Sequence, residues 1–276
     1  MSPCPHPELF LFAPGPSSDL RGAVVKVLLY PESGSGAFLW MKIVINTLTV
    51  SFGKTGIGCY AGGLVEATQL LSGGNEFIYL TGPDGLPDIP EEQLLRVAQP
   101  SMIWEQLHLP TELEHLHADL YHSPLFTCPI VRQVPSVITL HDVIPEARPD
   151  LCSEKFLAFY RANIGPALRA CDHILTVSDF SAQEIMTHLK IPSDKVHVVH
   201  QSVSDRFSPD RQEDASRVRE KFGLPEQYIL YVGMLEPRKN VKRLIRAFGA
   251  VADDLGGTAL VLCGRTDDPG FTIEDE

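Results

Sequence analysis

The chain has 276 residues, 44% hydrophobic and 21% charged, which is the composition of a soluble globular protein with one large domain or two ordinary ones. A formal net charge of −12 argues against nucleic acid as a partner, because nucleic-acid phosphates need compensating Lys and Arg side chains. The six cysteines include no CxxC pair, which argues against a zinc or redox motif and predicts reduced thiols in a cytoplasmic protein.

The first 40 residues differ in composition from the rest. Residues 1–22 are rich in proline, and residues 31–36 read as a Pro/Ser/Gly linker. A strand-like segment, MKIVIN at residues 41–46, follows. We therefore expect residues 1–40 to be a poorly ordered N-terminal extension. Whether this extension is a genuine arm or an untranslated segment stays open.

From residue 41 onward, short apolar segments alternate with segments whose apolar residues recur at helical spacing. Strands are predicted at residues 43–45, 77–80, 118–122, 136–140, 173–177 and 196–199. Helices are predicted at residues 57–71, 91–98 and 154–170, and after Phe180. Parallel strands need helical crossovers, so this alternation predicts an α/β fold with a doubly wound parallel sheet, a Rossmann-like domain over residues 41–203. The apolar segments are strand-length, which predicts no transmembrane helix.

Two helical segments carry local signals. Pro166 is expected to break the helix at 154–170 in two. In the next helix, Ser181 and Glu184 have the spacing of a capping box, and Phe180 and Ile185 can close a hydrophobic staple around it.

A polar segment at residues 202–216 reads as a linker, after which a second α/β unit begins. A strand at 228–232, a helix that ends at Gly256 and a strand at 259–263 are predicted. Residues 204–276 are too few for a complete Rossmann-like domain, so the sequence predicts only the first part of a second one.

The glycine-rich segment 53–58 is the first candidate site. It is not a P-loop, because Leu48 stands where that motif needs its first glycine. Gly56 and Gly58 fit part of a dinucleotide-binding fingerprint, but they stand too far from the preceding strand, and no acidic residue ends the second strand. A loop that leads into a helix N-terminus predicts an anion site instead. An ordinary strand–helix turn is the alternative.

His141 and Asp142 follow the strand predicted at 136–140. Polar side chains at the carboxyl end of a strand face the ligand crevice of an open α/β sheet. A histidine there can donate a hydrogen bond to a hydroxyl group or stabilise a developing charge. The alternative is a histidine that only caps the following turn.

The segment Glu236-Pro237-Arg238-Lys239 follows a buried-type strand and is expected to open a helix. Two cations at a helix N-terminus oppose the helix dipole, and such an unfavourable placement indicates a function such as binding a diphosphate. A solvated basic face is the alternative.

Four histidines lie close together in the sequence, but no pair has the i,i+4 spacing of helix metal ligands. They are His108, His115, His117 and His122. Surface or hydrogen-bonded histidines are the better interpretation, so we predict no metal site.

Five segments, in this order, resemble the family 4 (group 1) retaining glycosyltransferases of the GT-B fold, in particular the mannosyltransferase-like branch. They are MKIVIN at 41–46, TGIGCYAGGL at 55–64, LHDVIPE at 140–146, VSDFSAQEI at 177–185 and YVGMLEPRKNVKRLIRAF at 231–248. The resemblance covers roughly residues 41 to 265, and the last segment is the most specific.

The resemblance implies that the N-terminal domain holds the acceptor, that the C-terminal domain binds a nucleotide-sugar, and that reaction occurs between them. The implied activity is hexosyl transfer, with retention, to a glycan or lipid-linked acceptor in surface-polysaccharide assembly. No cofactor or metal is implied besides the nucleotide-sugar. Any membrane contact would be peripheral, at the cytoplasmic face of the inner membrane.

The resemblance also implies roles for single residues. Gly56 and Gly58 would lie near the donor phosphates, and His141 would contact the transferred sugar. Arg238 and Lys239 would neutralise the diphosphate leaving group. Asp142 and Glu236 would line the cleft.

Three features depart from the family pattern. Met234 follows Gly233 where many relatives carry arginine, and Gln201-Ser202-Val203 replaces the usual Asn-Gly-Val. No two glutamates separated by seven residues follow Cys263, although the family uses such a pair to hold the donor. We therefore expect a C-terminally truncated chain with little or no transferase activity of its own. The alternative function is a non-catalytic remnant or an acceptor-binding module.

Overall fold

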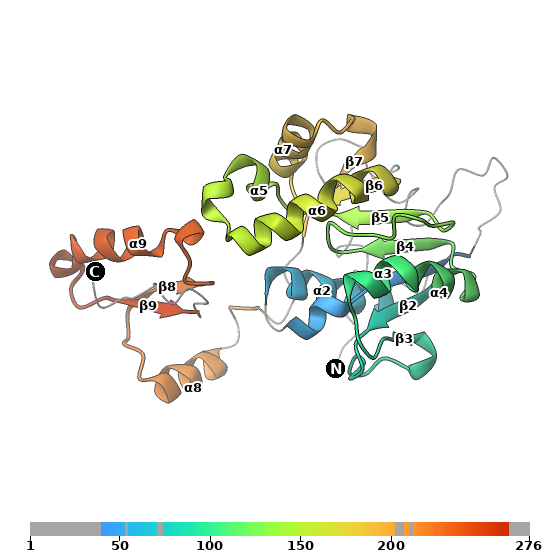
Figure 1. Cartoon of the computed structure of the whole chain (residues 1–276). Coiled ribbons are helices and arrows are strands. Elements are labelled where there is room, and N and C mark those ends of the chain that lie inside the picture. Colours follow the sequence, from blue (N-terminus) through green and yellow to red (C-terminus); the bar gives the residue numbers. More distant parts are fainter. Residues whose placement is uncertain (1–39, 53–54, 71–73, 202–206, 210–211, 265–276) are drawn as a thin grey trace. The chain divides into compact units, whose positions relative to one another are not determined.

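The computed structural model describes residues 40–52, 55–70, 74–201, 207–209 and 212–264. The chain divides into two compact units (Figure 1). One holds Met1–Pro149 and Ser153–Ser204, and the other holds Asp150–Cys152 and Asp205–Glu276. The predicted N-terminal extension, apart from Trp40, lies outside the described residues.

A parallel sheet forms the centre of the first unit, as the sequence predicted, but it has seven strands where the sequence predicted six. Its strand order is β3-β2-β1-β4-β5-β6-β7. The strands are β1 (Lys42–Asn46), β2 (Glu76–Thr81), β3 (Leu94–Arg96), β4 (Leu120–Ser123), β5 (Ser136–Thr139), β6 (His173–Thr176) and β7 (Val196–Val198). The strand order reverses beside β1, and the crevice at such a switch point, outside the carboxyl ends of the strands, is where open α/β sheets bind ligands.

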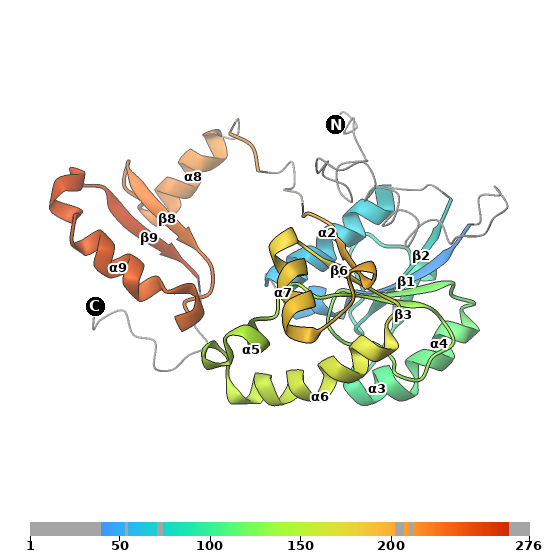
Figure 2. The ribbon, with the colours of Figure 1, turned by 90° about the horizontal axis from the view of Figure 1, so that it is seen from above.

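Helices cover both faces of this sheet. α2 (Gly56–Leu70) packs on one face, through Leu64 and Val65. The other face carries α3 (Met102–Leu107), α4 (Leu109–His115), α6 (Glu154–Ala170) and α7 (Asp179–Leu189), which contribute to the larger core cluster. Figure 2 shows α2 on one side of the sheet and α3, α4 and α6 on the other.

The helix predicted at 91–98 is wrong. A single 3-10 turn, η3 (Glu91–Gln93), leads into the edge strand β3, which pairs with β2. Leu94 packs in the core on the α2 side and Leu95 in the core on the opposite side. Side chains that alternate between two cores require a strand, and sheet pairing overrides the local pattern.

The predicted break at Pro166 is also wrong, because α6 runs without interruption from Glu154 to Ala170. Buried side chains lie on both sides of the proline, Tyr160 and Ile164 before it and Leu168 after it. Packing of this one face against the sheet holds the two halves of the helix in line.

The capping box proposed for α7 is wrong as well. The helix begins at Asp179, and the hydroxyl of Ser178 accepts a hydrogen bond from the backbone N–H of Ser181 at 3.1 Å. Ser178 is therefore the N-cap. Phe180 is 75% exposed, so it closes no staple.

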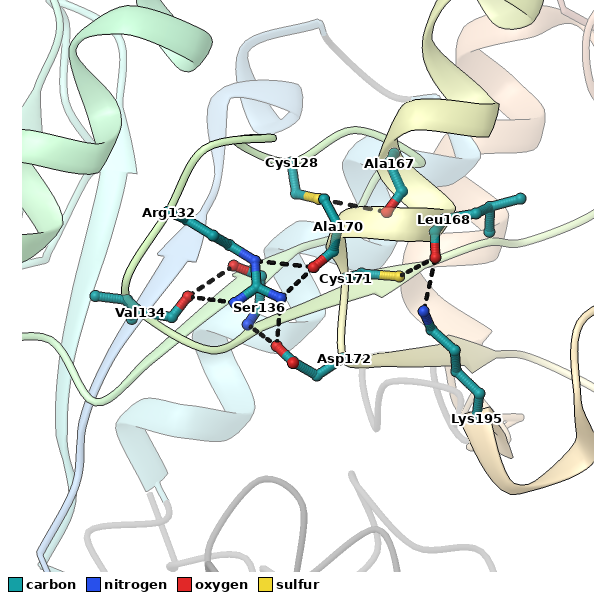
Figure 3. A network of polar contacts seen from close by, with 10 residues as sticks. All are labelled: Cys128, Arg132, Val134, Ser136, Ala167, Leu168, Ala170, Cys171, Asp172 and Lys195. Carbon is teal, nitrogen blue, oxygen red and sulfur yellow. Dashed lines mark hydrogen bonds and ion pairs between the residues drawn. The ribbon is translucent and has the colours of Figure 1, made fainter.

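The carboxyl end of α6 is held by two cations from neighbouring segments (Figure 3). The guanidinium of Arg132 donates to the carbonyl of Ala170 and forms an ion pair with Asp172 at 2.7 Å. The Lys195 ammonium donates to the carbonyl of Leu168 at 2.6 Å. Both bonds satisfy carbonyls that have no partner within the helix, and both cations complement its dipole.

The second unit contains α8 (Gln212–Phe222), β8 (Tyr228–Val232), α9 (Val241–Gly249) and β9 (Ala259–Cys263). β8 and β9 pair in parallel, as the predicted strand–helix–strand order requires. α8 begins inside the segment that was predicted to be a linker. Its apolar residues are few, which explains why the periodicity did not show it.

Candidate functional site

The first turn of α2 lies at the carboxyl end of the sheet. Gly56 is exposed, and a Cβ added there would meet no heavy atom within 4 Å. Gly58 is buried, and its N–H donates to the hydroxyl of Thr55 at 3.1 Å. Thr55 thus satisfies one orphan N–H of this helix end, and the N–H of the exposed Gly56 has no acceptor within the helix.

His141 follows β5 and is half-buried. Its Nε2 lies 3.2 Å from the carbonyl oxygen of Pro124, in the loop after β4. A carbonyl can only accept, so Nε2 carries the proton and, in the neutral ring, Nδ1 keeps a free lone pair. Burial lowers the pKa of His141, and the Pro124 carbonyl and Asp142 oppose this shift only in part. His141 is therefore neutral at pH 7.

Tyr60 joins His141 to the α2 helix. The two rings meet edge to face, with centroids 4.8 Å apart and an interplanar angle of 87°. The structure thus brings the first turns of α2 together with His141, while residues 53 and 54 of the glycine-rich segment lie outside the described residues. Tyr60 itself was missed, because one tyrosine in a helix has no signal that separates it from a core residue.

Hydrogen bonds through the Thr139 hydroxyl link the Tyr60 side chain to His122. The Tyr60 hydroxyl lies 3.3 Å from Thr139 Oγ1, and His122 Nε2 lies 2.9 Å from the same oxygen. Thr139 is the last residue of β5, and His122 lies in β4. The sequence interpretation of His122 as a hydrogen-bonded histidine agrees with this geometry, but the link to the candidate site was not foreseen.

These groups are uncharged near pH 7. Burial, and to a smaller extent the nearby His141, lower the pKa of His122 to about 4. Burial raises the pKa of the Tyr60 hydroxyl, and the hydrogen bond with Thr139 opposes this shift. The chain from His122 to Tyr60 is therefore a neutral hydrogen-bond network that fixes ring orientation.

Asp142 is exposed and has a local partner. Its Oδ1 accepts a hydrogen bond from the N–H of Ile144 at 3.1 Å, at the start of α5 (Ile144–Ala147). The carboxylate therefore caps the turn after β5. Sequence reasoning assigned that capping role to His141 as its alternative, and the structure gives it to the neighbouring residue.

Glycines in the second unit allow two loops to touch. A Cβ on Gly264, which follows β9, would lie 1.8 Å from the carbonyl oxygen of Gly233, which follows β8. The N–H of Gly233 donates to the carbonyl of Cys263 at 3.0 Å. The Tyr231 hydroxyl donates to the carbonyl of Met234 at 2.8 Å. These contacts fix the start of the loop that carries the predicted cations.

Arg238 and Lys239 do not open an α-helix. They lie in the 3-10 turn η6 (Pro237–Lys239), and α9 begins after Asn240, which has a φ of 55°. Arg238 forms an ion pair with Glu236 at 2.5 Å. The argument from helix-dipole repulsion is therefore wrong for this pair. Lys239 is exposed, and within the described part of the chain its ammonium has no ion-pair partner.

Residues 73–207, which contain His141 and six of the seven strands, match the family model described as Glycosyltransferase Family 4. This segment is a family 4 glycosyltransferase domain. The matched segment includes β5 and His141, whereas α2 lies before its first residue.

The family 4 domain has mannosyltransferase relatives. The chain is 28% identical over 229 residues to "O-antigen chain mannosyltransferase B" of Escherichia coli, which covers 75% of this chain and 60% of the relative. It is 30% identical over 141 residues to "O-antigen chain mannosyltransferase RfbU" of Salmonella typhimurium, which covers 51% of this chain and 35% of the relative. The chain thus spans no more than about 60% of these relatives' length.

Two solved structures are similar to a lesser degree. Anabaena HepE in complex with UDP matches at 14% identity and a TM-score of 0.47, over 83% of this chain and 70% of that one. The co-structure of S. aureus MnaA with UDP also matches at 14% identity and a TM-score of 0.47, over 83% of this chain and 64% of that one. These values are too low to transfer a function.

Within the described residues, no three His, Cys, Asp or Glu side chains gather closely enough to hold a metal ion. Among the same residues, no helix is both long and apolar enough to cross a membrane. The five cysteines in this part of the chain are free thiols.

Proposed function

We propose that the candidate site serves hexosyl transfer from a nucleotide-sugar to a glycan or lipid-linked acceptor, with retained anomeric configuration, in surface-polysaccharide assembly. The observation that carries the proposal is the placement of a neutral His141 beside the first turns of α2, at the carboxyl end of β5 in a family 4 domain. The names of the relatives, two O-antigen mannosyltransferases, favour mannose or a similar hexose.

His141 would orient the transferred sugar. Because Nε2 donates to Pro124, Nδ1 is left to accept a hydrogen bond from a sugar hydroxyl. This reverses the donor role that the sequence suggested. The edge contact with Tyr60 holds the ring plane, so the acceptor nitrogen has a fixed direction.

The N-terminus of α2 would face an anionic part of a ligand. Its orphan N–H groups and the positive end of the helix dipole favour a phosphate there. Gly56 keeps the backbone accessible, because no side chain covers it. Gly58 contributes differently, since its N–H is already bonded to Thr55 and its burial lets the first turn pack closely.

For the second unit, we propose that Lys239 binds the diphosphate of the donor. Charge grows on the diphosphate as the glycosidic bond breaks, and a cation placed beforehand stabilises it. Lys239 is exposed, whereas Arg238 would first have to exchange its carboxylate partner Glu236 for a phosphate. Lys239 is therefore the stronger candidate of the two.

The proposal includes no cofactor besides the nucleotide-sugar. It places the chain in the cytoplasm, with at most peripheral contact to the inner membrane where a lipid-linked acceptor would lie.

The test offers the 276-residue chain a panel of nucleoside diphosphate hexoses together with oligosaccharide and lipid-linked acceptors. Product mass measures transfer, and the NMR coupling at the new anomeric centre measures retention. His141→Ala should lower transfer at least about tenfold, whereas the control His188→Ala, at a partly exposed Glu184 pair on α7, should not change it. Transfer with inversion, or transfer unaffected by His141→Ala, would contradict the proposal.

A second candidate function is acceptor binding without transfer. The contacts of His141 favour it, because the groups that hold this side chain all lie in the first unit. This candidate predicts saturable binding of a glycan acceptor, weakened by His141→Ala, with no product from any donor. Absence of both binding and transfer would rule out both functions.

A further inference from the structure

One buried carboxyl group has no part in the chemistry proposed above. Glu105 of α3 is 8% exposed, and it is the one buried acidic side chain among the described residues. Within the same part of the chain it pairs with no cation. A buried acid without a countercharge is costly, so its position calls for a role other than packing.

The contacts of Glu105 lead first to the segment between β4 and β5, residues 124–135. Thr127 Oγ1 donates a hydrogen bond to Glu105 Oε1 at 3.2 Å. The next residue of α3, Gln106, donates to the carbonyl of Cys128 at 3.0 Å and accepts from the N–H of Ile130 at 2.9 Å. On the other side of the segment, Cys128 contacts α6 (Figure 3). The β4–β5 segment is therefore held between α3 and α6.

This segment begins with the group that fixes His141. Pro124 directly follows β4, and its carbonyl oxygen accepts the hydrogen bond from His141 Nε2. Thr127 stands three residues further along the chain. Between them, the Phe126 ring packs against the buried Tyr160 ring, with centroids 5.2 Å apart, so the intervening chain is itself held in place. A shift at Thr127 would therefore move the acceptor that orients His141.

A second connection leads from Glu105 toward α2. The Tyr121 hydroxyl forms a hydrogen bond with the Glu105 carboxyl, and it accepts one from Asn46 Nδ2 at 3.0 Å. Asn46 is the last residue of β1, and its Oδ1 accepts from the N–H of Leu48 at 3.1 Å, at the start of η2 (Leu48–Phe52). η2 lies against α2. This connection therefore reaches the helix whose first turns form the other half of the candidate site.

Both connections end at Glu105 as the acceptor. Thr127 and Tyr121 donate to the carboxyl group, and Asn46 donates to Tyr121. Successive hydrogen bonds polarise one another, and bonds to an ionised acceptor are roughly twice as strong as bonds to a neutral one. The protonation state of Glu105 thus affects how firmly both connections are held.

We propose that Glu105 is a positioning residue for the candidate site, which holds His141 and the start of α2 in register through one buried carboxyl group. Glu105 acts through the Pro124 carbonyl on one side and through η2 on the other. The carboxylate holds both connections firmly, and the protonated acid holds them less firmly. This inference deepens the proposed function, on which it rests for the reaction that an aligned site would perform.

Two other titratable groups face this carboxyl among the described residues, Tyr121 from β4 and Cys128 from the β4–β5 segment. Burial raises the pKa of the Tyr121 hydroxyl well above its usual range. Burial also raises the pKa of the Cys128 thiol to about 12, with smaller contributions from nearby acidic groups. Both groups are neutral near pH 7, whereas burial raises the pKa of Glu105 to about 7. A change in this cluster near pH 7 therefore belongs to Glu105.

NMR of the full chain with isotope-labelled histidine tests the proposal, with the His141 ring signals identified by their loss in His141→Gln. Because burial holds the pKa of His141 below 6.5, a separate step in its signals with a midpoint near pH 7 reports a neighbouring group. Wild type should show this step, and Glu105→Gln should abolish it. Glu112→Gln, the same substitution at a half-buried position of α4, is the matched control and should retain it.

Two further variants separate the two connections. Thr127→Val removes a donor to Glu105 and should reduce the His141 step at least about twofold. Tyr121→Phe interrupts the second connection, so it should reduce the pH-dependent shift of the Gly56 backbone N–H signal by about the same factor. Circular dichroism confirms that each variant is folded, and if Glu105→Gln does not fold, Thr127→Val decides by the same signal.

A wild-type chain without the step, a step that persists in Glu105→Gln, or an equal loss in Glu112→Gln would overturn the proposal. A purely structural Glu105 would change stability and leave the His141 signals without this step. The NMR measurement needs no sugar transfer, so the two proposals fail separately. A chain that shows the step but transfers no sugar loses only the transferase, and a chain that transfers sugar without the step loses only the positioning role.

Discussion

The two units contain the same local pattern, a parallel strand followed by a polar loop and a helix, yet they differ in burial. β5 of the first unit is buried along its whole length. β8 of the second unit is not, and Ile229, Leu230 and Val232 are between 45% and 70% exposed. The first sheet has helices on both faces, whereas Leu235 and Val241 are the only buried members of the core cluster among the described residues of the second unit.

This difference shows what fixes a functional side chain. His141 has a ring neighbour, a backbone acceptor and a buried chain of hydrogen bonds behind that neighbour. Lys239 lies on an exposed turn. A strand–loop–helix pattern is thus enough to place a loop, but the layers around it determine how rigidly its side chains are held.

The largest expected effect distinguishes the two sheets by stability. Ile138→Ala, at a fully buried position of β5, should lower the free energy of unfolding by about 4 kcal/mol, because it leaves a cavity in a packed core. The two tryptophans, Trp40 and Trp104, both lie in the first unit, so their fluorescence in urea follows its unfolding. Leu230→Ala, at a half-exposed position of β8, should leave that transition unchanged. An equal shift in both variants would mean that the units unfold as one.

The next effect depends on pH. Burial raises the pKa of the Glu105 carboxyl from 4.5 to about 7, and hydrogen bonds from Thr127 and Tyr121 oppose this shift. Between pH 4.5 and about pH 7, the Glu105 carboxyl is protonated in the folded chain and ionised in the unfolded chain. The free energy of unfolding should therefore fall by about 3 kcal/mol as pH rises through this window.

Glu105→Gln removes this contribution and should make the chain more stable than wild type above about pH 7. The same variant should also reveal the contribution of His122, whose pKa is lowered on folding from 6.5 to about 4. Because of this shift, the free energy of unfolding should decrease as pH falls from 6.5 to about 4, which is the opposite pH dependence to that of Glu105. Urea unfolding of both proteins across this pH range measures the two slopes. A wild-type-like profile in Glu105→Gln would show that this carboxyl is not the buried acid described.

A smaller effect concerns the end of α6. Arg132→Ala should cost about 2 kcal/mol, because it leaves the Ala170 carbonyl and the Asp172 carboxylate without their charged donor. Arg132→Lys should restore little of this, since one ammonium cannot reproduce the planar set of donors. Full recovery of the urea midpoint in the lysine variant would indicate that only charge matters.

The smallest effect tests the cap of α7. Phe180→Ser should change the free energy of unfolding by less than about 0.5 kcal/mol, because the ring is mostly exposed. Ser178→Ala removes the observed N-cap and should cost about 1 kcal/mol. If the ranking of these two variants were reversed in thermal unfolding, the sequence-predicted staple would be correct after all.

Most of the sheet was predictable from the sequence, because buried parallel strands are short apolar segments and helices with one apolar face repeat at a fixed spacing. β3 was not predictable, since its two leucines pack on opposite faces only after it pairs with β2. The helix break predicted at Pro166 was wrong for a related reason. Packing of α6 against the sheet keeps the helix continuous, and such packing is not visible in the local sequence.

The candidate site followed the same division. The position of His141 near the start of α2 was predictable, because strand ends and helix starts meet at one edge of a parallel sheet. Tyr60 and Thr139 were missed, since their role depends on side-chain contacts between α2, β4 and β5. The ion pair of Arg238 with Glu236 was missed because the 3-10 turn that permits it resembles a helix start in the sequence.

Titration calorimetry of the 276-residue chain with nucleoside diphosphate hexoses tests the central claim most directly, since it measures donor recognition without requiring turnover. The account predicts saturable binding of at least one donor, weakened about fivefold or more by Lys239→Ala and unchanged by the control Lys221→Ala. Binding that Lys239→Ala leaves intact, or no binding of any donor in the panel, would contradict the assignment of a nucleotide-sugar site to this chain.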